Sequence, residues 1–367
     1  MFPISGFNRS RFRAPAISML AVAALVTAGC GSSSKTATTS PTSNGGTSGG
    51  SKGPWKIAYL AQGTTNSFAA QLDAIVKKTA TASGKVSNLA YFDGTGDADK
   101  QLGQIETALA QKPDAIILTP LGKAADTGPV NRAAKLNIPV ILCASSVNSN
   151  NYTSLVTPDP YAAALPLAKW LVNDQLKGKG TVAVVDGIAG NDTSEQFGKA
   201  LRDAVKAAPG VKIVQQGYGA FSVSKSKQLA QTFMSGGKKI DAWWGSGGEA
   251  AGGIMNALVD AKVSPMPPVA GAAATNGTLR LAKENHIPIG MLQFPATLGK
   301  NCVEAALAAL EHKPVEKLVN VSALPGNEDF YTQDIDKYYN AKYTDDYQTG
   351  SDKVLSEAEL RSLHLLK

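Results

Sequence analysis

The residues that could carry out catalysis do not occur in this sequence at the spacing that catalysis needs. GSGG at positions 245–248 departs from the Gly-x-Ser-x-Gly pattern that exposes a nucleophilic serine, and GTG at 94–96 lacks the third glycine of a dinucleotide-binding loop. The three cysteines and three histidines are isolated, without a second Cys or His at metal-ligand spacing. We therefore expect a protein that is not an enzyme, with no cofactor and no metal site.

An acidic loop is the one stretch that suggests a metal. Asp93, Asp97 and Asp99 supply the oxygen donors that calcium prefers, but the loop lacks the twelve-residue spacing and the terminal glutamate of a calcium-binding hand. The pattern favours a turn followed by the N-cap of a helix.

The composition is that of a globular protein with room for two domains. The chain has 367 residues, of which 43% are hydrophobic and 18% charged. Its net charge is +7, and three of the positive charges lie in the first thirteen residues, a segment that we expect to be removed. The remaining lysines and arginines are scattered, so we expect no nucleic-acid partner.

The N-terminus has the features of an export signal. Arg9, Arg11 and Arg13 precede an apolar run at 14–26, which is too short to span a bilayer comfortably and ends in small residues. This order predicts an export signal over residues 1–29.

The last residues of that signal indicate whether the mature protein is attached to a membrane. TAGC at 27–30 resembles the lipobox of bacterial lipoproteins, although Thr27 stands where the family prefers leucine. The resemblance implies that Cys30 is acylated and anchors the protein at the extracytoplasmic face of the cell membrane. The alternative is ordinary secretion with Cys30 as a free thiol. Residues 31–53 are rich in Gly, Ser and Thr. We expect residues 30–54 to form a lipidated, flexible tether that spans on the order of 25 Å.

The middle of the chain contains the unit that must position any binding site. Apolar residues recur at helical spacing within 102–109, and short apolar runs follow at 115–118 and 138–143, separated by a second helical segment. Runs without polar alternation are typical of parallel strands covered on both faces. Ligands bind beyond the carboxyl ends of such strands, which here are Thr119 and residues 143–146.

The same alternation of strands and helices continues along the chain. The other expected strands lie at 56–60, 86–92, 154–157, 181–186, 211–217, 242–245, 269–273 and 289–293. Ten strands exceed the usual size of one sheet, so we expect two α/β sheets.

At this point the sequence resembles a known family. QIETALAQKPDAIILTP, followed by AAKLNIPVILCAS, is similar to the ribose/galactose class of substrate-binding proteins of bacterial ABC transporters, which have the type I periplasmic binding protein fold. The resemblance covers residues 56–321. It implies two doubly wound parallel-sheet lobes joined by a three-strand hinge. The implied N-terminal lobe is 55–157 plus 294–323, and the C-terminal lobe is 158–293 plus 324–367.

The resemblance also implies ligand-binding residues. Asn66 and Phe68 match a loop whose amide and ring contact the ligand, Phe221 matches an aromatic residue on the opposite ligand face, and Gln293 matches a hydroxyl-binding glutamine. For both phenylalanines the alternative is packing within a lobe. The full expected set is Asn66, Phe68, Thr119, Ser145, Asn191, Phe221, Glu249 and Gln293.

Several positions depart from the sugar binders. Ala144-Ser145 replaces Asp-Arg, Gly247-Gly248 replaces Asn-Asp, Ala273 replaces an aspartate, and the arginine expected after Gly190 is absent. These losses favour a ligand that is bulkier or less hydroxylated than a free pentose or hexose, such as a deoxy or substituted sugar, a nucleoside-like or an aromatic compound. Glu249 could receive a ligand amine if it faces the cleft, and the alternative is a solvated glutamate at a helix start.

We therefore expect a monomeric solute-binding lipoprotein that delivers a small, cyclic ligand to an ABC permease. The alternative function is a sensing module that signals through a membrane kinase or chemoreceptor. Two further expectations concern structure. Cys143 and Cys302 should remain separate thiols, and residues 326–367 should pack over the second lobe at the edge of its sheet, with a capped helix that begins after Ser356.

Overall fold

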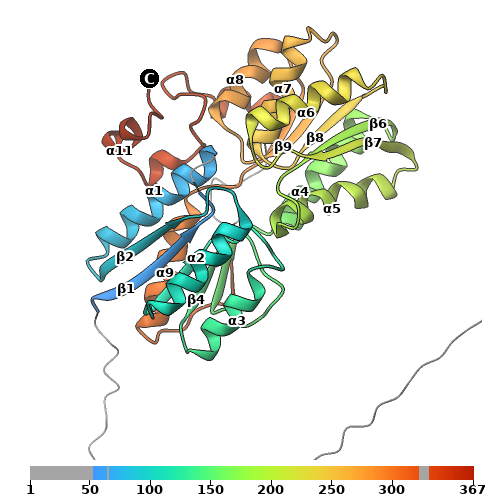
Figure 1. The fold of residues 1–367 in the computed structure, drawn as a ribbon. Helices are drawn as coiled ribbons and strands as arrows, with labels where there is room; N and C mark the ends of the chain where they lie inside the picture. Colours follow the sequence, from blue (N-terminus) through green and yellow to red (C-terminus); the bar gives the residue numbers. More distant parts are fainter. Residues whose placement is uncertain (1–52, 64–65, 322–329) are drawn as a thin grey trace, which may run out of the picture. The chain divides into compact units, whose positions relative to one another are not determined.

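The computed structural model describes residues 53–63, 66–321 and 330–367. The predicted export signal, Cys30 and most of the tether lie outside these ranges. Within them the chain forms two sheets with alternating helices (Figure 1). No helix in the described part of the chain is long and apolar enough to cross a membrane.

The first sheet has six parallel strands in the order β11-β5-β4-β3-β1-β2. These strands are β1 (Trp55–Ala61), β2 (Val86–Asp93), β3 (Ala115–Leu118), β4 (Val140–Cys143), β5 (Ser154–Thr157) and β11 (Leu318–Asn320). Every residue of β3 and β4 is buried, as the unbroken apolar runs predict.

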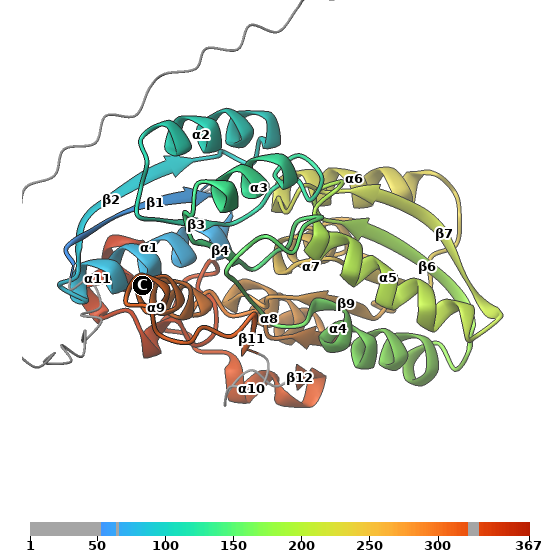
Figure 2. The same cartoon turned by 90° about the horizontal axis from the view of Figure 1, so that it is seen from below.

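Helices cover both faces of this sheet (Figure 2). They are α1 (Ser67–Ala82) and α9 (Leu298–Leu310) on one face, and α2 (Ala98–Ala110) and α3 (Thr127–Lys135) on the other. Successive residues of β1 point to opposite faces, so Ile57 and Tyr59 join the hydrophobic cluster of α1 and α9, whereas Ala58 and Leu60 join that of α2 and α3.

The second sheet has the order β12-β10-β9-β8-β6-β7 and is parallel except for β12. Its strands are β6 (Lys179–Asp186), β7 (Gly210–Tyr218), β8 (Ala242–Gly245), β9 (Val269–Ala272), β10 (Ile289–Leu292) and β12 (Phe330–Tyr331). Its helices are α4 (Pro160–Lys169), which continues as a π-helix (Trp170–Gln175), α5 (Asp192–Lys206), α6 (Val223–Ser235), α7 (Gly248–Asp260) and α8 (Asn276–Asn285). The expected fold class, two parallel-sheet lobes, is confirmed.

The acidic loop has the structure expected of a turn and a helix cap. The Asp97 side chain accepts hydrogen bonds from the backbone N–H groups of Asp99 and Lys100 and so caps α2. Asp93 accepts one from the backbone of Thr95. No group of three or more His, Cys, Asp or Glu side chains in the described ranges is arranged to hold a metal ion.

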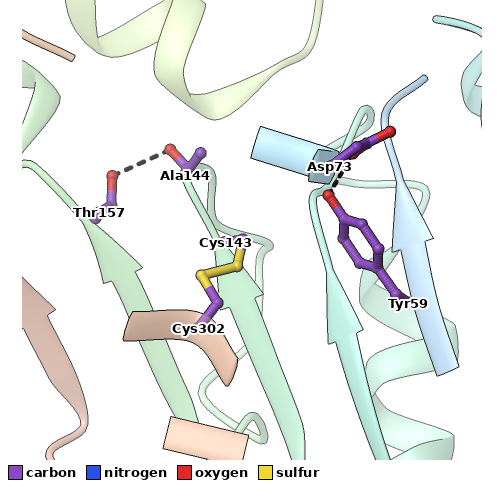
Figure 3. Close-up of a disulfide and its surroundings, with 6 residues drawn as sticks. All are labelled: Tyr59, Asp73, Cys143, Ala144, Thr157 and Cys302. Carbon is purple, nitrogen blue, oxygen red and sulfur yellow. Dashed lines mark hydrogen bonds between the residues drawn. A yellow bond between two sulfur atoms is a disulfide. The ribbon is translucent and has the colours of Figure 1, made fainter. Parts of the chain in front are cut away.

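The expectation of separate thiols is wrong, because Cys143 and Cys302 form a disulfide with their Cα atoms 6.1 Å apart (Figure 3). Cys143 does end a buried strand and Cys302 does lie inside a helix, as the sequence indicates. However, α9 packs directly on the end of β4, so the two side chains meet at the face that the helix covers.

The C-terminal segment differs in part from the expectation. β12 pairs antiparallel with β10 and therefore does edge the second sheet. The capped helix is also present as α11 (Glu357–Ser362), with Ser356 and Glu359 forming a capping box. However, residues 343–366 also contact α1 of the first lobe, and Leu355 and Leu360 belong to the hydrophobic cluster that contains α1.

Candidate functional site

A cavity lies beyond the carboxyl ends of strands from both sheets. It encloses about 470 Å³ of space between its lining atoms, counting its open mouth. Its lining residues are Gln62, Asn66, Phe68, Thr119, Ala144, Ser145, Asn191, Thr193, Phe197, Phe221, Gly247, Glu249, Ala272, Ala273 and Phe294. Seven of the eight expected ligand-binding residues are in this set.

The eighth residue, Gln293, does not line the cavity. It directly follows the second sheet's strand β10, between Leu292 and Phe294, and its side chain is buried. Its Nε2 donor has no hydrogen-bond partner among the described residues. The role of Gln293 as a ligand contact therefore stays a prediction. Its neighbour Phe294 lines the cavity.

The N-terminus of α1 positions Asn66 and Phe68. The Asn66 side chain accepts a hydrogen bond from the backbone N–H of Ala69 at 2.9 Å and so caps the helix. The Phe68 ring lies edge-on to Phe294, with 5.5 Å between the ring centroids, and Phe294 lies edge-on to Phe197 at 5.9 Å. Phe68 thus packs in the core and also lines the cavity. The two alternatives for this residue, packing within a lobe and contact with a ligand, are therefore compatible.

Backbone strain positions the opposite aromatic face. Ala220 and Phe221 both have left-handed φ angles, of 54° and 50°, which are uncommon for residues other than glycine. This conformation places the Phe221 ring against two glycines. A Cβ on Gly187 would lie 2.2 Å from ring atoms of Phe221, and a Cβ on Gly247 would lie 3.0 Å from them. Both glycines are therefore needed for the ring to occupy its place at the cavity wall.

Asn191 joins the two lobes at the cavity. Its Oδ1 accepts from the backbone N–H of Ser194 at 3.1 Å and caps α5, while its Nδ2 donates to the carbonyl of Pro120 at 3.0 Å and to Ser145 Oγ at 3.3 Å. Thr193 adds a further bond between the lobes, from Oγ1 to the carbonyl of Ala144 at 2.8 Å. Asn191, Thr193 and Ser145 therefore hold the cleft closed in this conformation.

An ion pair continues this row of contacts outside the cavity. Lys123 Nζ lies 2.6 Å from Asp192 Oδ1, and Ser146 Oγ donates to the other carboxylate oxygen at 2.6 Å. Burial acts to raise the pKa of Asp192, but the bonds from Lys123 and Ser146 outweigh it and hold the pKa below its usual range.

Glu249 is the one ionisable side chain among the described residues that line the cavity. It lies in the first turn of α7 and is only 4% exposed, so the alternative of a solvated glutamate is wrong. Burial raises the pKa of its carboxyl group to about 7. Its Oε1 lies 3.5 Å from the backbone N–H of Phe68 across the cleft.

Five lining residues were not singled out by the sequence analysis: Gln62, Thr193, Phe197, Ala272 and Phe294. Phe294 could have been found from its place beside Gln293, where the chain passes from β10 of the second sheet to α9 of the first lobe. Phe197 lies one turn into α5, and its helical pattern indicates only burial. The assembled site offers neutral hydrogen-bonding groups, aromatic faces and one carboxyl group, an arrangement that suits reversible binding.

Comparison with known proteins places the chain in a family. Residues 57–314 match the family described as "periplasmic binding protein domain". The galactofuranose-binding protein of Escherichia coli (strain K12) is 26% identical over 219 residues, or 58% of this chain and 68% of that protein. The ribose import binding protein of Bacillus subtilis (strain 168) is 24% identical over 272 residues, or 74% of this chain and 87% of that protein.

A solved structure agrees on the fold. An ABC transporter solute-binding protein from Bacillus halodurans, with bound myo-inositol, is 22% identical with a TM-score of 0.70, and the match covers 78% of this chain and 98% of that one. The family match spans well over half of the sequence and both lobes. The chain belongs to the periplasmic binding protein domain family.

Proposed function

We propose that this protein is the extracytoplasmic solute-binding component of an ABC importer. Its two lobes close on a small cyclic, sugar-like ligand and deliver it to a membrane permease. The observation that carries the proposal is the cavity, which lies between the two sheets and combines two aromatic faces with neutral hydrogen-bonding groups. Relatives named for galactofuranose and ribose support this ligand class.

The wall of the cavity supports a particular kind of ligand. Phe68 and Phe221 offer apolar faces to a ring, while Asn66, Thr119 and Ser145 can exchange hydrogen bonds with hydroxyl groups. No lysine or arginine of the described chain lines the cavity. Charged hydrogen bonds contribute about 1.5 to 3 kcal/mol each. A ligand of this site therefore obtains more of its affinity from ring packing, as in a deoxy or substituted sugar.

The placement of the protein is the second part of the proposal. Acylated Cys30 holds the folded lobes at the outer face of the cell membrane through the tether. The disulfide between Cys143 and Cys302 supports this placement, because such bonds persist in oxidising compartments outside the cytoplasm.

A thermal-shift panel of pentoses, hexoses, deoxy sugars, cyclitols and nucleosides tests the proposed ligand class. A ligand at a hundred times its dissociation constant adds about 2.7 kcal/mol of stability. We expect such stabilisation by at least one cyclic compound, and a panel without any stabilising compound would contradict the proposal. Deletion of the gene tests the transport role, because an importer component is required for uptake of that ligand, whereas a sensing module is not.

A further inference from the structure

The first inference concerns Glu249 and deepens the proposed function, on which it rests. Glu249 is buried in the cavity wall, yet it forms no ion pair with any residue of the described ranges. Its carboxylate lies near Gly247 and hence near the Phe221 ring. A buried carboxylate without a cation is costly, and a bound cation would remove that cost.

The charges around Glu249 add to the case. Asp346 is close enough to raise the pKa of Glu249 further, after the larger effect of burial. The nearest arginine in the adjoining groove, Arg280, is already paired with Asp345 and Glu284. Backbone N–H groups of Ser67, Phe68 and Glu249 itself act in the opposite direction and lower the pKa, but the described residues that line the cavity and this groove include no free cation to neutralise the carboxylate.

We propose that the cavity takes a cyclic ligand that carries an amino group, and that Glu249 receives its ammonium. The neighbouring Phe221 ring suits the same group, because a cation near an aromatic face is attracted by the ring. Glu249 then determines specificity: it selects the amino compound over the hydroxyl compound of the same shape.

Matched pairs of probes test this inference by calorimetric titration near neutral pH. We would use glucose with glucosamine, galactose with galactosamine, and myo-inositol with its amino-deoxy analogue. At least one amine should bind about tenfold or more tightly than its hydroxyl partner, and Glu249→Gln should remove that preference. If Glu249 only closes the cleft, Glu249→Gln weakens both members of a pair equally, and the inference fails.

The outcomes separate this inference from the proposed function. Binding of hydroxyl compounds without any preference for amines overturns the role of Glu249 and leaves the proposed function in place. A panel in which neither class binds overturns both.

A second inference rests on separate observations and concerns residues 340–367, the C-terminal strap. Its residues hold together as a unit, because the stacked rings of Tyr343 and Tyr347 both donate from their hydroxyl groups to Asp352, at 2.9 and 2.6 Å. Figures 1 and 2 both show α11, within this strap, beside α1 of the first lobe.

The strap is bonded to the second lobe through the start of α8. Asn276 Nδ2 donates to the carbonyls of Asn340 and Tyr343, both at 3.0 Å. Arg280 pairs with both carboxylate oxygens of Asp345, at 3.0 and 2.7 Å. Such a two-bond pairing is strong and directional.

The strap is bonded equally to the first lobe through α1. Gln71 donates from Nε2 to the carbonyl of Asp346 at 2.9 Å and accepts from the backbone N–H of Gln348 at 3.1 Å. Lys78 Nζ donates to the carbonyl of Val354 at 2.7 Å and pairs with Glu359 at 2.6 Å. The lobes cannot separate at this edge unless one of the two sets of bonds breaks.

We infer that the strap is a latch that favours the closed conformation and so sets ligand affinity. Its loss lowers the closed fraction of the ligand-free protein, and apparent affinity falls by the same factor. A double-mutant cycle tests this mechanism. Gln71→Ala weakens the contact with the first lobe and Arg280→Ala the contact with the second.

A latch requires both ends, so the two variants should each lower affinity and the double variant should lower it no further. Additive losses, or an unchanged affinity in both single variants, would show that the strap does not couple the lobes. Lys238→Ala on the second lobe, whose side chain donates to the carbonyl of Val214, is the matched control and should bind as the wild type does. Unfolding curves of each variant separate lost latching from lost stability.

Discussion

A substitution at Gly187 should move the Phe221 ring out of the cavity although Phe221 itself is unchanged. Gly187 has an ordinary backbone conformation, and its carbonyl accepts from the N–H of Ala220 at 3.0 Å, so the backbone here can carry an alanine but cannot easily move. In Gly187→Ala the new methyl group would lie 2.2 Å from ring atoms, far inside van der Waals contact. The ring must therefore rotate away from the ligand.

The size of the effect follows from the area of one ring face. A phenylalanine buries roughly 150 to 250 Å², so the face toward the ligand contributes about 100 Å². At about 25 cal/mol per Å² this is roughly 2.5 kcal/mol, and at 1.4 kcal/mol per decade it is roughly 60-fold in affinity.

Calorimetric titration with the ligand found in the thermal-shift panel measures this loss. Phe221→Ala should lose a similar amount, and the double variant should be no weaker than Phe221→Ala, because both changes remove the same contact. Gly103→Ala, where an added Cβ meets nothing within 4 Å, is the matched control. Wild-type affinity in Gly187→Ala would refute the assignment of Phe221 to the ligand face.

Three further predictions concern placement and stability. Cys30→Ser should move the protein from the membrane to the soluble fraction, and a variant that stays in the membrane would contradict the lipid anchor. Cys143 and Cys302 should be unreactive to thiol reagents in denatured, unreduced protein, and reduction should lower the free energy of unfolding by about 3 to 5 kcal/mol, since the bond joins residues 159 apart. Burial raises the pKa of Asp126 to about 6 because the charged carboxylate is less stable in the folded protein than in the unfolded chain. The free energy of unfolding therefore falls as pH rises from about 4 to about 6 and stays at the lower value above that. Asp126→Asn should therefore stabilise the protein by up to about 3 kcal/mol in urea unfolding above neutral pH and by nothing near pH 4; an equal gain at both pH values would show that ionisation is not the cause.

Much of the fold could be predicted because the buried strands are read directly from the sequence. Apolar runs such as AIIL in β3 and VILC in β4 have one interpretation when helical segments flank them. The disulfide could not be predicted in this way, because the pairing of Cys143 with Cys302 depends on which helix covers which strand. The same limit applies to the strap, whose contacts with α1 join residues more than 270 positions apart.

The lining of the cavity could be predicted where loops follow strands and less well elsewhere, while contact of these residues with a ligand stays a prediction. Asn66, Thr119 and Ser145 lie just past strand ends, so topology alone brings them together. Phe197 lies on a helix, and its role depends on packing against Phe294. Gln293 was assigned from resemblance alone, and local geometry at the crossing turns Phe294 toward the cavity in its place.

Native mass spectrometry of the protein purified from its own source tests the central claim most directly. We expect one small molecule of the cyclic polyol or amino-polyol class, bound in a one-to-one complex, released on unfolding and depleted in Phe221→Ala. Wild-type protein that carries no such molecule, and retains none when incubated with the compounds of the thermal-shift panel, would contradict the claim that the lobes close on a sugar-like ligand.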